Sequence, residues 1–274
     1  MPHSLTPSQW TLAATSTIYP LILYTSLPTH PSPTRLAQSR EAISIVHCTL
    51  ITALSLACLR QSSISSLLTR LPSNSDIPDR DLPIITQRSE FGNAITALET
   101  AYLLQDSVVL FYASRVARRP GQGSTTKGLN ITHLAWHHAG LSVALGLLQV
   151  YIARGREKGV LVVVMMMLMN ASSPFGTLRW FLVNFRPDAR WGIMLTTVAY
   201  LVTFGLCRVY LIYYILATFG AQKGRSAIEA FVRLKWHCQL GTGAIGVINT
   251  AWFVIGVLKF TRRYVQGGTR YKKN

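Results

Sequence analysis

Two carboxylates and a pair of adjacent histidines stand out because they lie within long apolar stretches. Glu99 and Asp106 are seven residues apart in one stretch, and His137 and His138 lie in the next. Residues seven apart on a helix share one face, which here also holds Tyr102. An ionisable group inside a membrane span is costly and usually functional. A carboxylate that orients an imidazole makes it a base or a nucleophile near neutral pH. We therefore expect proton or acyl transfer, with His137, His138 and Asp106 as the catalytic candidates.

Two other interpretations of such residues stay open. These residues could instead form hydrogen bonds between helices and so fix how the helices pack. We favour that interpretation for Glu99, for His133 and for His47, a lone histidine in an earlier apolar stretch. The imidazoles of His133, His137 and His138, together with a carboxylate, could instead bind zinc or iron. Their spacing resembles no closed zinc motif, so we predict no metal site.

Further polar residues surround a predicted break in a later apolar stretch. Asn170, Ser172 and Ser173 come directly before Pro174, and Gly176 follows. Proline removes a backbone donor and kinks or breaks a helix. A broken helix at membrane depth is tolerated where it lines a cavity, so its freed backbone and hydroxyl groups could contact a lipid headgroup. The alternative is a plain kink in which the serine hydroxyls satisfy the backbone.

Two arginines accompany this break. Arg179 lies near the end of the same stretch, where it could reach an interfacial phosphate. Arg208 lies in the middle of the next stretch, where a cation needs a partner, and we expect that partner to be Asp106 or Glu99. The candidate substrate-binding residues are Tyr102, Asn170, Ser172, Ser173, Arg179 and Arg208.

Membrane-spanning helices must position these residues. A span needs about 20 mostly apolar residues, and 49% of this 274-residue chain is hydrophobic whereas only 14% is charged. About seven stretches reach that length, which predicts an all-α, polytopic transmembrane helical bundle. The predicted spans are 10–27, 41–59, 94–113, 131–153, 160–183, 192–219 and 240–260. We expect an N-terminal span with a Pro-rich connection (1–40), a six-span transmembrane domain (41–261) and a basic cytosolic tail (262–274).

The distribution of charge favours a membrane partner over nucleic acid. The net charge is +17, and the basic residues lie between the apolar stretches, which suits anionic lipid headgroups. The positive-inside rule favours a cytosolic C-terminus, and residues 270–274 loosely resemble an endoplasmic-reticulum retrieval signal. A homodimer is compatible with a helical membrane protein, although no residue here demonstrates one.

A glycine pattern opens the last predicted span. Gly241, Gly243 and Gly246 match the dinucleotide-binding fingerprint, but no strand precedes them. We interpret the pattern as close packing between helices.

The order of these features resembles the TLC domain family, named for TRAM, longevity-assurance and ceroid-lipofuscinosis proteins. The resemblance covers about residues 41–260 and rests on short motifs in six consecutive spans. These are Ser44-Ile45-Val46-His47, Ala101-Tyr102 with Asp106, His137-His138, Ser172-Ser173-Pro174-Phe175 with Arg179-Trp180, Arg208, and Asn249 with Trp252.

The resemblance implies a protein of lipid metabolism in the endoplasmic reticulum. Ceramide synthases of this family transfer an acyl group from acyl-coenzyme A to a sphingoid amine and depend on a paired histidine, whose position His137 and His138 take. We therefore expect acyl transfer to a lipid amine or hydroxyl, as in sphingolipid synthesis, with acyl-coenzyme A as co-substrate and no further cofactor. Those enzymes carry acidic residues where this chain has Asn170 and Ser173, and Thr where it has Leu141. The alternative expectation is a non-catalytic lipid sensor, scaffold or cargo receptor.

Overall fold

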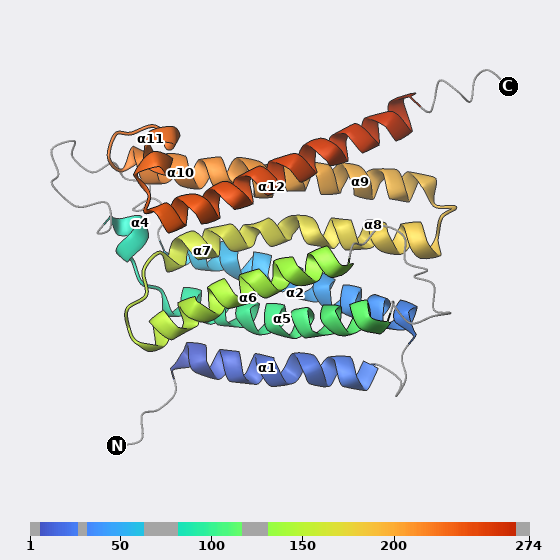
Figure 1. Cartoon of the computed structure of the whole chain (residues 1–274), viewed down its shortest axis with the longest axis horizontal. Helices are drawn as coiled ribbons and strands as arrows, with labels where there is room; N and C mark the ends of the chain where they lie inside the picture. The colour runs from blue at the N-terminus through green and yellow to red at the C-terminus, as the bar shows by residue number, and fades with distance from the viewer. Residues whose placement is uncertain (1–5, 27–31, 63–81, 117–130, 267–274) are drawn as a thin grey trace.

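The computed structural model describes residues 6–26, 32–62, 82–116 and 131–266. Seven helical rods of 20 residues or more make up most of this part, and Figure 1 shows them aligned along one axis. The rods are α1 (Pro7–Ser26), α2 (Pro33–Gln61), α5 (Glu90–Val116), α6 (Ile131–Ala153), α7 with α8 (Val160–Met167 and Ser173–Phe185), α9 with α10 (Arg190–Phe204 and Leu211–Ala221) and α12 (Trp236–Thr261). The short helices α4 (Pro83–Thr86) and α11 (Ala227–Arg233) lie between rods, and these described residues contain no strand. The predicted all-α fold is confirmed.

Five of the described rods are long and apolar enough to cross a membrane. They are Thr34–Gln61, Glu90–Arg115, Val160–Phe185, Arg190–Ala221 and Trp236–Tyr264. The other two rods, α1 and α6, correspond to the first and fourth predicted spans and lie along the same axis (Figure 1). The chain is therefore an integral membrane protein with a polytopic helical bundle.

Two of the rods change their winding midway. A 3₁₀ turn, η2 (Leu168–Ser172), joins α7 to α8, and a π-helical turn, η3 (Gly205–Tyr210), joins α9 to α10. The predicted interruption thus lies at 168–172, one turn before Pro174, because proline is well tolerated in the first turn of α8. Such irregular turns inside a helix often mark functional sites.

Helix α5 lies at the centre of the bundle, and α12 lies at its edge. α5 contacts α1, α2, α6 and α7, and 67% of its apolar window is buried, against 6% for α12. Helices in a bilayer associate through close packing and polar contacts, since lipid is as apolar as leucine. The polar side chains of α5 are therefore placed to meet those of several neighbours at once.

Helices α2 and α5 each have an apolar part and a polar part. Ile51 of α2 and Ile95 of α5 are buried in an apolar cluster with Ile84 of α4 and with Leu161 and Val164 of α7. The buried ionisable residues lie in the first half of α2 and farther along α5. Because the two helices contact each other, these polar parts face one another.

The close-packing interpretation of the glycine pattern in α12 holds only at Gly243, where a Cβ would lie 3.5 Å from Cζ of Phe231 in α11. No described atom lies within 4 Å of where a Cβ would stand on Gly241 or Gly246. Helix α12 approaches its neighbour farther along, where a Cβ on Gly256 would lie 2.9 Å from Cδ2 of Leu201 in α9.

Candidate functional site

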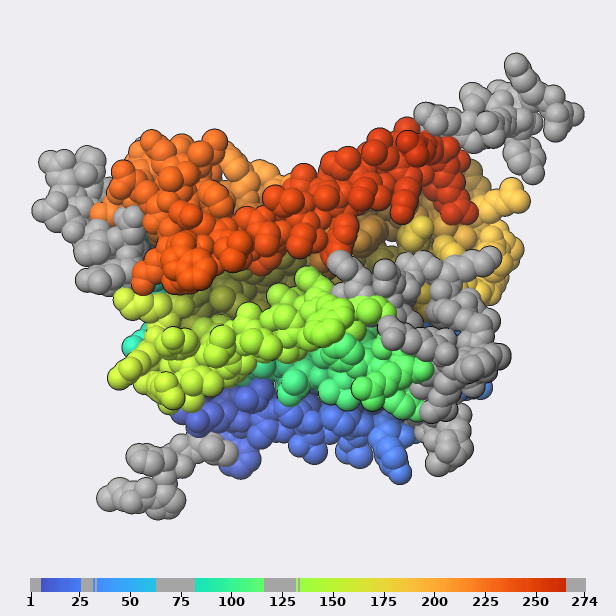
Figure 2. Space-filling view, viewed as in Figure 1, coloured from blue at the N-terminus to red at the C-terminus, as the bar shows by residue number. Residues whose placement is uncertain are grey.

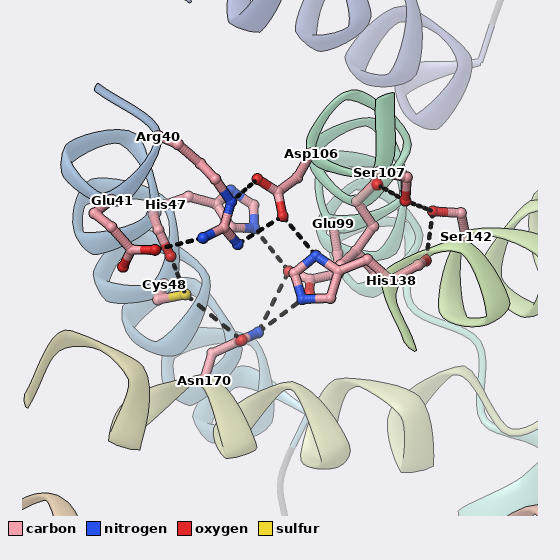
Figure 3. A network of polar contacts seen from close by, with 12 residues as sticks. Arg40, Glu41, His47, Cys48, Glu99, Asp106, Ser107, His138, Ser142 and Asn170 are labelled. Carbon is pink, nitrogen blue, oxygen red and sulfur yellow. Dashed lines mark hydrogen bonds and ion pairs between the residues drawn. The ribbon is translucent and has the colours of Figure 1, made fainter. Parts of the chain in front are cut away.

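Polar side chains from α2, α5, α6 and η2 meet inside the bundle, as Figure 3 shows. We call this group the polar core. Its members are Arg40, Glu41, His47, Glu99, Asp106, His138 and Asn170. From the sequence, Asp106 was predicted to lie beside His137 or His138, and the structure places it beside His138.

Asp106 of α5 lies between a cation and an imidazole. Its Oδ1 accepts a hydrogen bond from Nε of Arg40 at 2.7 Å, and its Oδ2 accepts one from Nη2 of the same residue at 2.9 Å. Nδ1 of His138 lies 2.6 Å from Oδ2, although its angle falls outside hydrogen-bond geometry. Catalytic hydrogen bonds are often poorly aligned until substrate binds. Asp106 therefore has the position that a residue orienting His138 requires.

The third nitrogen of the Arg40 guanidinium, Nη1, contacts a second carboxylate. Nη1 of Arg40 donates to Oε1 of Glu41, and Oε2 of Glu41 accepts from Oγ1 of Thr177 in α8, at 2.9 Å. All three charged groups are nearly buried. Charges out of water are tolerated when they are paired and hydrogen-bonded. This network fixes the carboxylate of Asp106 in one place.

A second imidazole lies in a separate chain of hydrogen bonds. Nε2 of His47 lies 2.8 Å from Oε2 of Glu99, and Nδ1 of His47 lies 2.5 Å from the hydroxyl of Tyr19 in α1. Nδ2 of Asn170 donates to both oxygens of Glu99 at 3.3 Å. Glu99 and His47 thus belong to the polar core, and their contacts suit the packing role that their sequence positions favoured.

Tyr102 packs against the face of the His47 ring. The two rings are stacked, with centroids 3.7 Å apart and planes 14° apart, and Tyr102 is only 3% exposed. A contact between Tyr102 and substrate stays a prediction.

Arg208 does not pair with Asp106 or Glu99, so that expectation is wrong. Its Nε donates to the carbonyl of Met169 and to Oγ of Ser172, at 3.1 and 2.8 Å, and its Nη2 donates to Oγ of Ser173 at 3.1 Å. Asp106 is instead paired with Arg40 of α2. Arg208 binds the irregular turn η2 because that turn offers a carbonyl and two hydroxyls.

Arg179 lies apart from these contacts. Its Nε donates to Oγ1 of Thr197 in α9 at 3.0 Å. The residue ties α8 to α9, and an interaction with an interfacial phosphate stays a prediction.

The two adjacent histidines point in different directions. His138 faces Asp106, whereas the ring of His137 meets that of Trp252 in α12, with centroids 6.1 Å apart. Figure 2 shows a hollow between α6 and α12, with α7 visible between them. His137 and Trp252 bring α6 and α12 into contact, and the side chain of His138 is 14% exposed.

The metal alternative finds no support in the described residues. No group of three or more His, Cys, Asp and Glu side chains there could hold a metal ion. His133, one of the three imidazoles of that alternative, has a side chain outside the described set.

Three members of this arrangement were missed from the sequence. They are Tyr19, which lies inside the predicted span 10–27, and Arg40 and Glu41. The last two lie at the expected start of the transmembrane domain, where charged residues usually mark a membrane surface. The signal that could have found Arg40 is the excess of carboxylates over cations in the predicted spans 41–59 and 94–113, since buried carboxylates need a counter-ion.

The arrangement can support acid–base chemistry at His138. If Nδ1 carries the proton that faces Asp106, Nε2 holds the lone pair and can accept a proton or attack a carbonyl. Arg208 and the hydroxyls of η2 offer donors for an oxygen anion elsewhere in the same bundle.

Comparison with known proteins agrees with this architecture. The family model described as the TLC domain matches residues 39–256, which is about four-fifths of the chain. Neither the curated proteins nor the solved structures gave a match. The helical bundle and the length of the family match lead to one conclusion: the chain belongs to the TLC domain family.

Proposed function

We propose that the protein transfers an acyl group from acyl-coenzyme A to the amine or hydroxyl of a membrane lipid. Membership of the TLC family supports a lipid-related function in general. The observation that carries the more specific proposal is the contact between Asp106 and His138, 2.6 Å apart inside an integral membrane bundle. An imidazole so oriented can act as a general base.

The mechanism uses His138 as base or as acyl acceptor. In the first version, Nε2 of His138 takes the proton of the lipid amine or hydroxyl while the nitrogen or oxygen attacks the thioester carbon. The carbon–sulfur bond then breaks, and the coenzyme A thiolate takes the proton from the imidazolium. In the second version, Nε2 itself attacks the thioester carbon and expels the coenzyme A thiolate. The lipid amine or hydroxyl then attacks the acyl-imidazole, the acyl group passes to the lipid, and the lipid's proton goes to the thiolate. Asp106 stabilises the positive ring in both versions.

The residues of η2 and their partner would hold the reacting oxygen. Arg208 is fixed on Ser172 and Ser173 and carries a positive charge within a membrane span. A cation and hydroxyl dipoles stabilise negative charge strongly where water is excluded. We assign Asn170, Ser172, Ser173 and Arg208 to contact with the thioester oxygen or the lipid headgroup.

The acyl chain would enter from the side of the bundle. Helix α12 packs on α9 and η3, whereas α6 packs on α5. Figure 2 shows a hollow between α6 and α12, the two helices that carry His137 and Trp252. A chain lying in this hollow would place its thioester near the paired histidines. We therefore give His137 a role in substrate contact beside Trp252.

The deciding experiment is lipid analysis of cells that lack this protein and re-express single variants at equal abundance. His138→Gln should lower the dependent lipid class by about 100-fold or more, the usual loss for a general base. His137→Gln should lower it less, and His237→Gln, at an exposed position outside the polar core, should restore it fully. Full restoration by His138→Gln would exclude this mechanism.

A second candidate function is a non-catalytic lipid sensor, scaffold or cargo receptor. The observation that favours it is the mutual satisfaction of the polar core, in which Arg40, Asp106, Glu41 and Thr177 already bind one another. Such a core can fix helix packing without any substrate. In that case, variants that disrupt the polar core should change the amount of lipid that co-purifies with the protein. His138→Gln should leave every lipid product unchanged.

We place the protein in the endoplasmic-reticulum membrane and its acceptor among sphingoid or related lipids. The support is the likeness of the His137-His138 pair to that of the ceramide synthases. Organelle fractionation tests the location, and the class of lipid lost in the first experiment names the acceptor.

A further inference from the structure

Helix α1 lies outside the region that the TLC family model covers, which begins at residue 39. It nevertheless packs along α5 (Figure 1). Its Tyr19 is 9% exposed, and its ring meets the edge of Tyr102 with centroids 5.6 Å apart. The hydroxyl of Tyr19 lies 2.5 Å from Nδ1 of His47. Helix α1, which lies outside the family region, therefore contributes the Tyr19 hydroxyl to the polar core.

The contact of His47 Nε2 with Glu99 determines whether the Tyr19 hydroxyl donates or accepts at Nδ1. Nε2 of His47 lies 2.8 Å from Oε2 of Glu99, and an ionised carboxylate only accepts hydrogen bonds. With Glu99 ionised and the ring neutral, the proton of the ring is on Nε2 and Nδ1 accepts. Tyr19 is the donor. Since the His47 side chain is 0% exposed, bulk water does not replace the hydroxyl.

The chain continues from Glu99 into the irregular turn η2. Asn170 of η2 donates to both oxygens of Glu99, and its own Oδ1 lies 3.7 Å from Sγ of Cys48. The preceding residue, Met169, offers its carbonyl to Arg208. Tyr19, His47, Glu99 and Asn170 thus connect α1 to the turn that binds Arg208.

We propose that Tyr19 is a positioning residue of the polar core. By holding His47 in one tautomer, it keeps Glu99 aimed at Asn170 and keeps η2 in the shape that presents Arg208. The link from α1 to η2 stands on the contacts alone, whereas its effect on acyl transfer rests on the proposed function. The TLC region of this chain is therefore incomplete without α1.

Two measurements on the full-length protein test this proposal. The first is a double-mutant cycle in the thermal midpoint of the purified protein, with Tyr19→Phe, Glu99→Gln and the pair. Tyr19→Phe removes only the hydroxyl, leaves Nδ1 of His47 buried without a donor, and should lower the midpoint by about 5 °C. Because both changes act on one imidazole, the double variant should lose clearly less than the sum. Tyr24→Phe, on the exposed side of the same helix at 81% exposure, is the control and should change nothing.

The second measurement is the rate of acyl transfer per folded molecule, with the acceptor found by lipid analysis. Tyr19→Phe should lower kcat by about 10-fold while the KM for acyl-coenzyme A stays within about twofold, since η2 is misplaced but the entry path is intact. If the midpoint losses of the two single variants simply add in the double variant, the hydrogen-bond chain from Tyr19 to Glu99 is overturned. If the losses are coupled but kcat does not change, the positioning role of Tyr19 is overturned. If no lipid class depends on the protein at all, the proposed function fails, and the double-mutant cycle still decides whether Tyr19 belongs to the core.

Discussion

At the level of single residues, Arg40 is the counter-ion of two buried carboxylates. It donates to both oxygens of Asp106 and to one of Glu41. Arg40→Met would leave those two buried negative charges without their counter-ion. Asp106→Asn would leave Arg40 still paired with Glu41. We expect Arg40→Met to lower the free energy of unfolding by about 3–5 kcal/mol and Asp106→Asn to lower it by less.

The thermal midpoint of the full-length protein in detergent measures this difference. Arg35→Met is the matched control, because Arg35 is an exposed cation one turn and a half earlier on α2. Its loss should change stability by no more than about 0.5 kcal/mol. Equal effects of the two arginine substitutions would show that the buried pairing of Arg40 does not stabilise the protein.

The sequence predicted Asp106 and one of His137 and His138 as partners, because all three are ionisable groups inside spans. Their pairing required only that neighbouring helices in the chain also be neighbours in space. The partnership of Arg40 with Asp106 joins residues 66 apart, and sequence spacing carries no sign of it. Arg208 was assigned the wrong partner for the same reason, since the choice among several buried acceptors depends on how the helices are packed.

At the level of elements, η2 is held in shape by the guanidinium of Arg208. Three hydrogen bonds from this one side chain reach Met169, Ser172 and Ser173. Lysine keeps the charge but lacks the planar fork, so Arg208→Lys should break most of these bonds. We expect a loss of about 1.5–3 kcal/mol in stability.

Thermal unfolding again measures the effect of Arg208→Lys, with Arg186→Lys as its control. Arg186 pairs with Asp188 on the surface, where both side chains are more than 70% exposed, and such pairs contribute little. A loss no larger than that of the control would mean that η2 keeps its shape without Arg208.

The turn between α10 and α11 depends on a close backbone approach at Gly220. A Cβ there would lie 2.7 Å from the carbonyl oxygen of Arg225 and 2.8 Å from that of Ser226. Ser226 also caps α11 through a reciprocal pair of hydrogen bonds with Glu229, and its backbone N–H lowers the pKa of the Glu229 carboxyl. Gly220→Ala must displace this capped turn.

We expect Gly220→Ala to destabilise the protein by about 1–3 kcal/mol, as overpacking does. Gly146→Ala in α6 is the matched change, because no described atom lies within 4 Å of its Cβ position. That change should be neutral or slightly stabilising, since alanine favours helix. The thermal midpoint and the rate of proteolysis within residues 222–235 distinguish the two variants. Equal midpoints and equal rates for Gly220→Ala and Gly146→Ala would contradict the close approach at Gly220.

The position of each rod was predictable, whereas the irregular turns were only partly so. Apolar length alone located seven rods, because the thickness of the bilayer imposes it. Pro174 signalled the break in the fifth rod, but the winding changes before it, where Arg208 supplies donors from another helix. The π-helical turn η3 has no proline and left no signal in the sequence.

At the level of the whole molecule, the number of spans follows from whether α1 and α6 cross the membrane. Five rods meet the criteria of length and composition, and α6 falls outside them although it is 23 residues long and lies along α5. Three histidines in its first eight residues lower its hydropathy. His138 faces Asp106 rather than lipid, so average hydropathy underestimates how well α6 suits a membrane.

Cysteine labelling in sealed microsomes tests this topology. Single cysteines replace Arg115 at the end of α5, Arg156 in the α6–α7 connection or Asp188 in the α8–α9 connection, in a background with Cys207→Ser and Cys238→Ser. Arg115 and Asp188 lie at the end of the bundle where α12 also ends, and Arg156 lies at the opposite end (Figure 1). If α6 crosses and the C-terminus is cytosolic, an impermeant maleimide should label positions 115 and 188 in intact vesicles and position 156 only after detergent. Equal labelling of 115 and 156 would mean that α6 does not cross; labelling of 156 alone would keep every span and reverse the orientation.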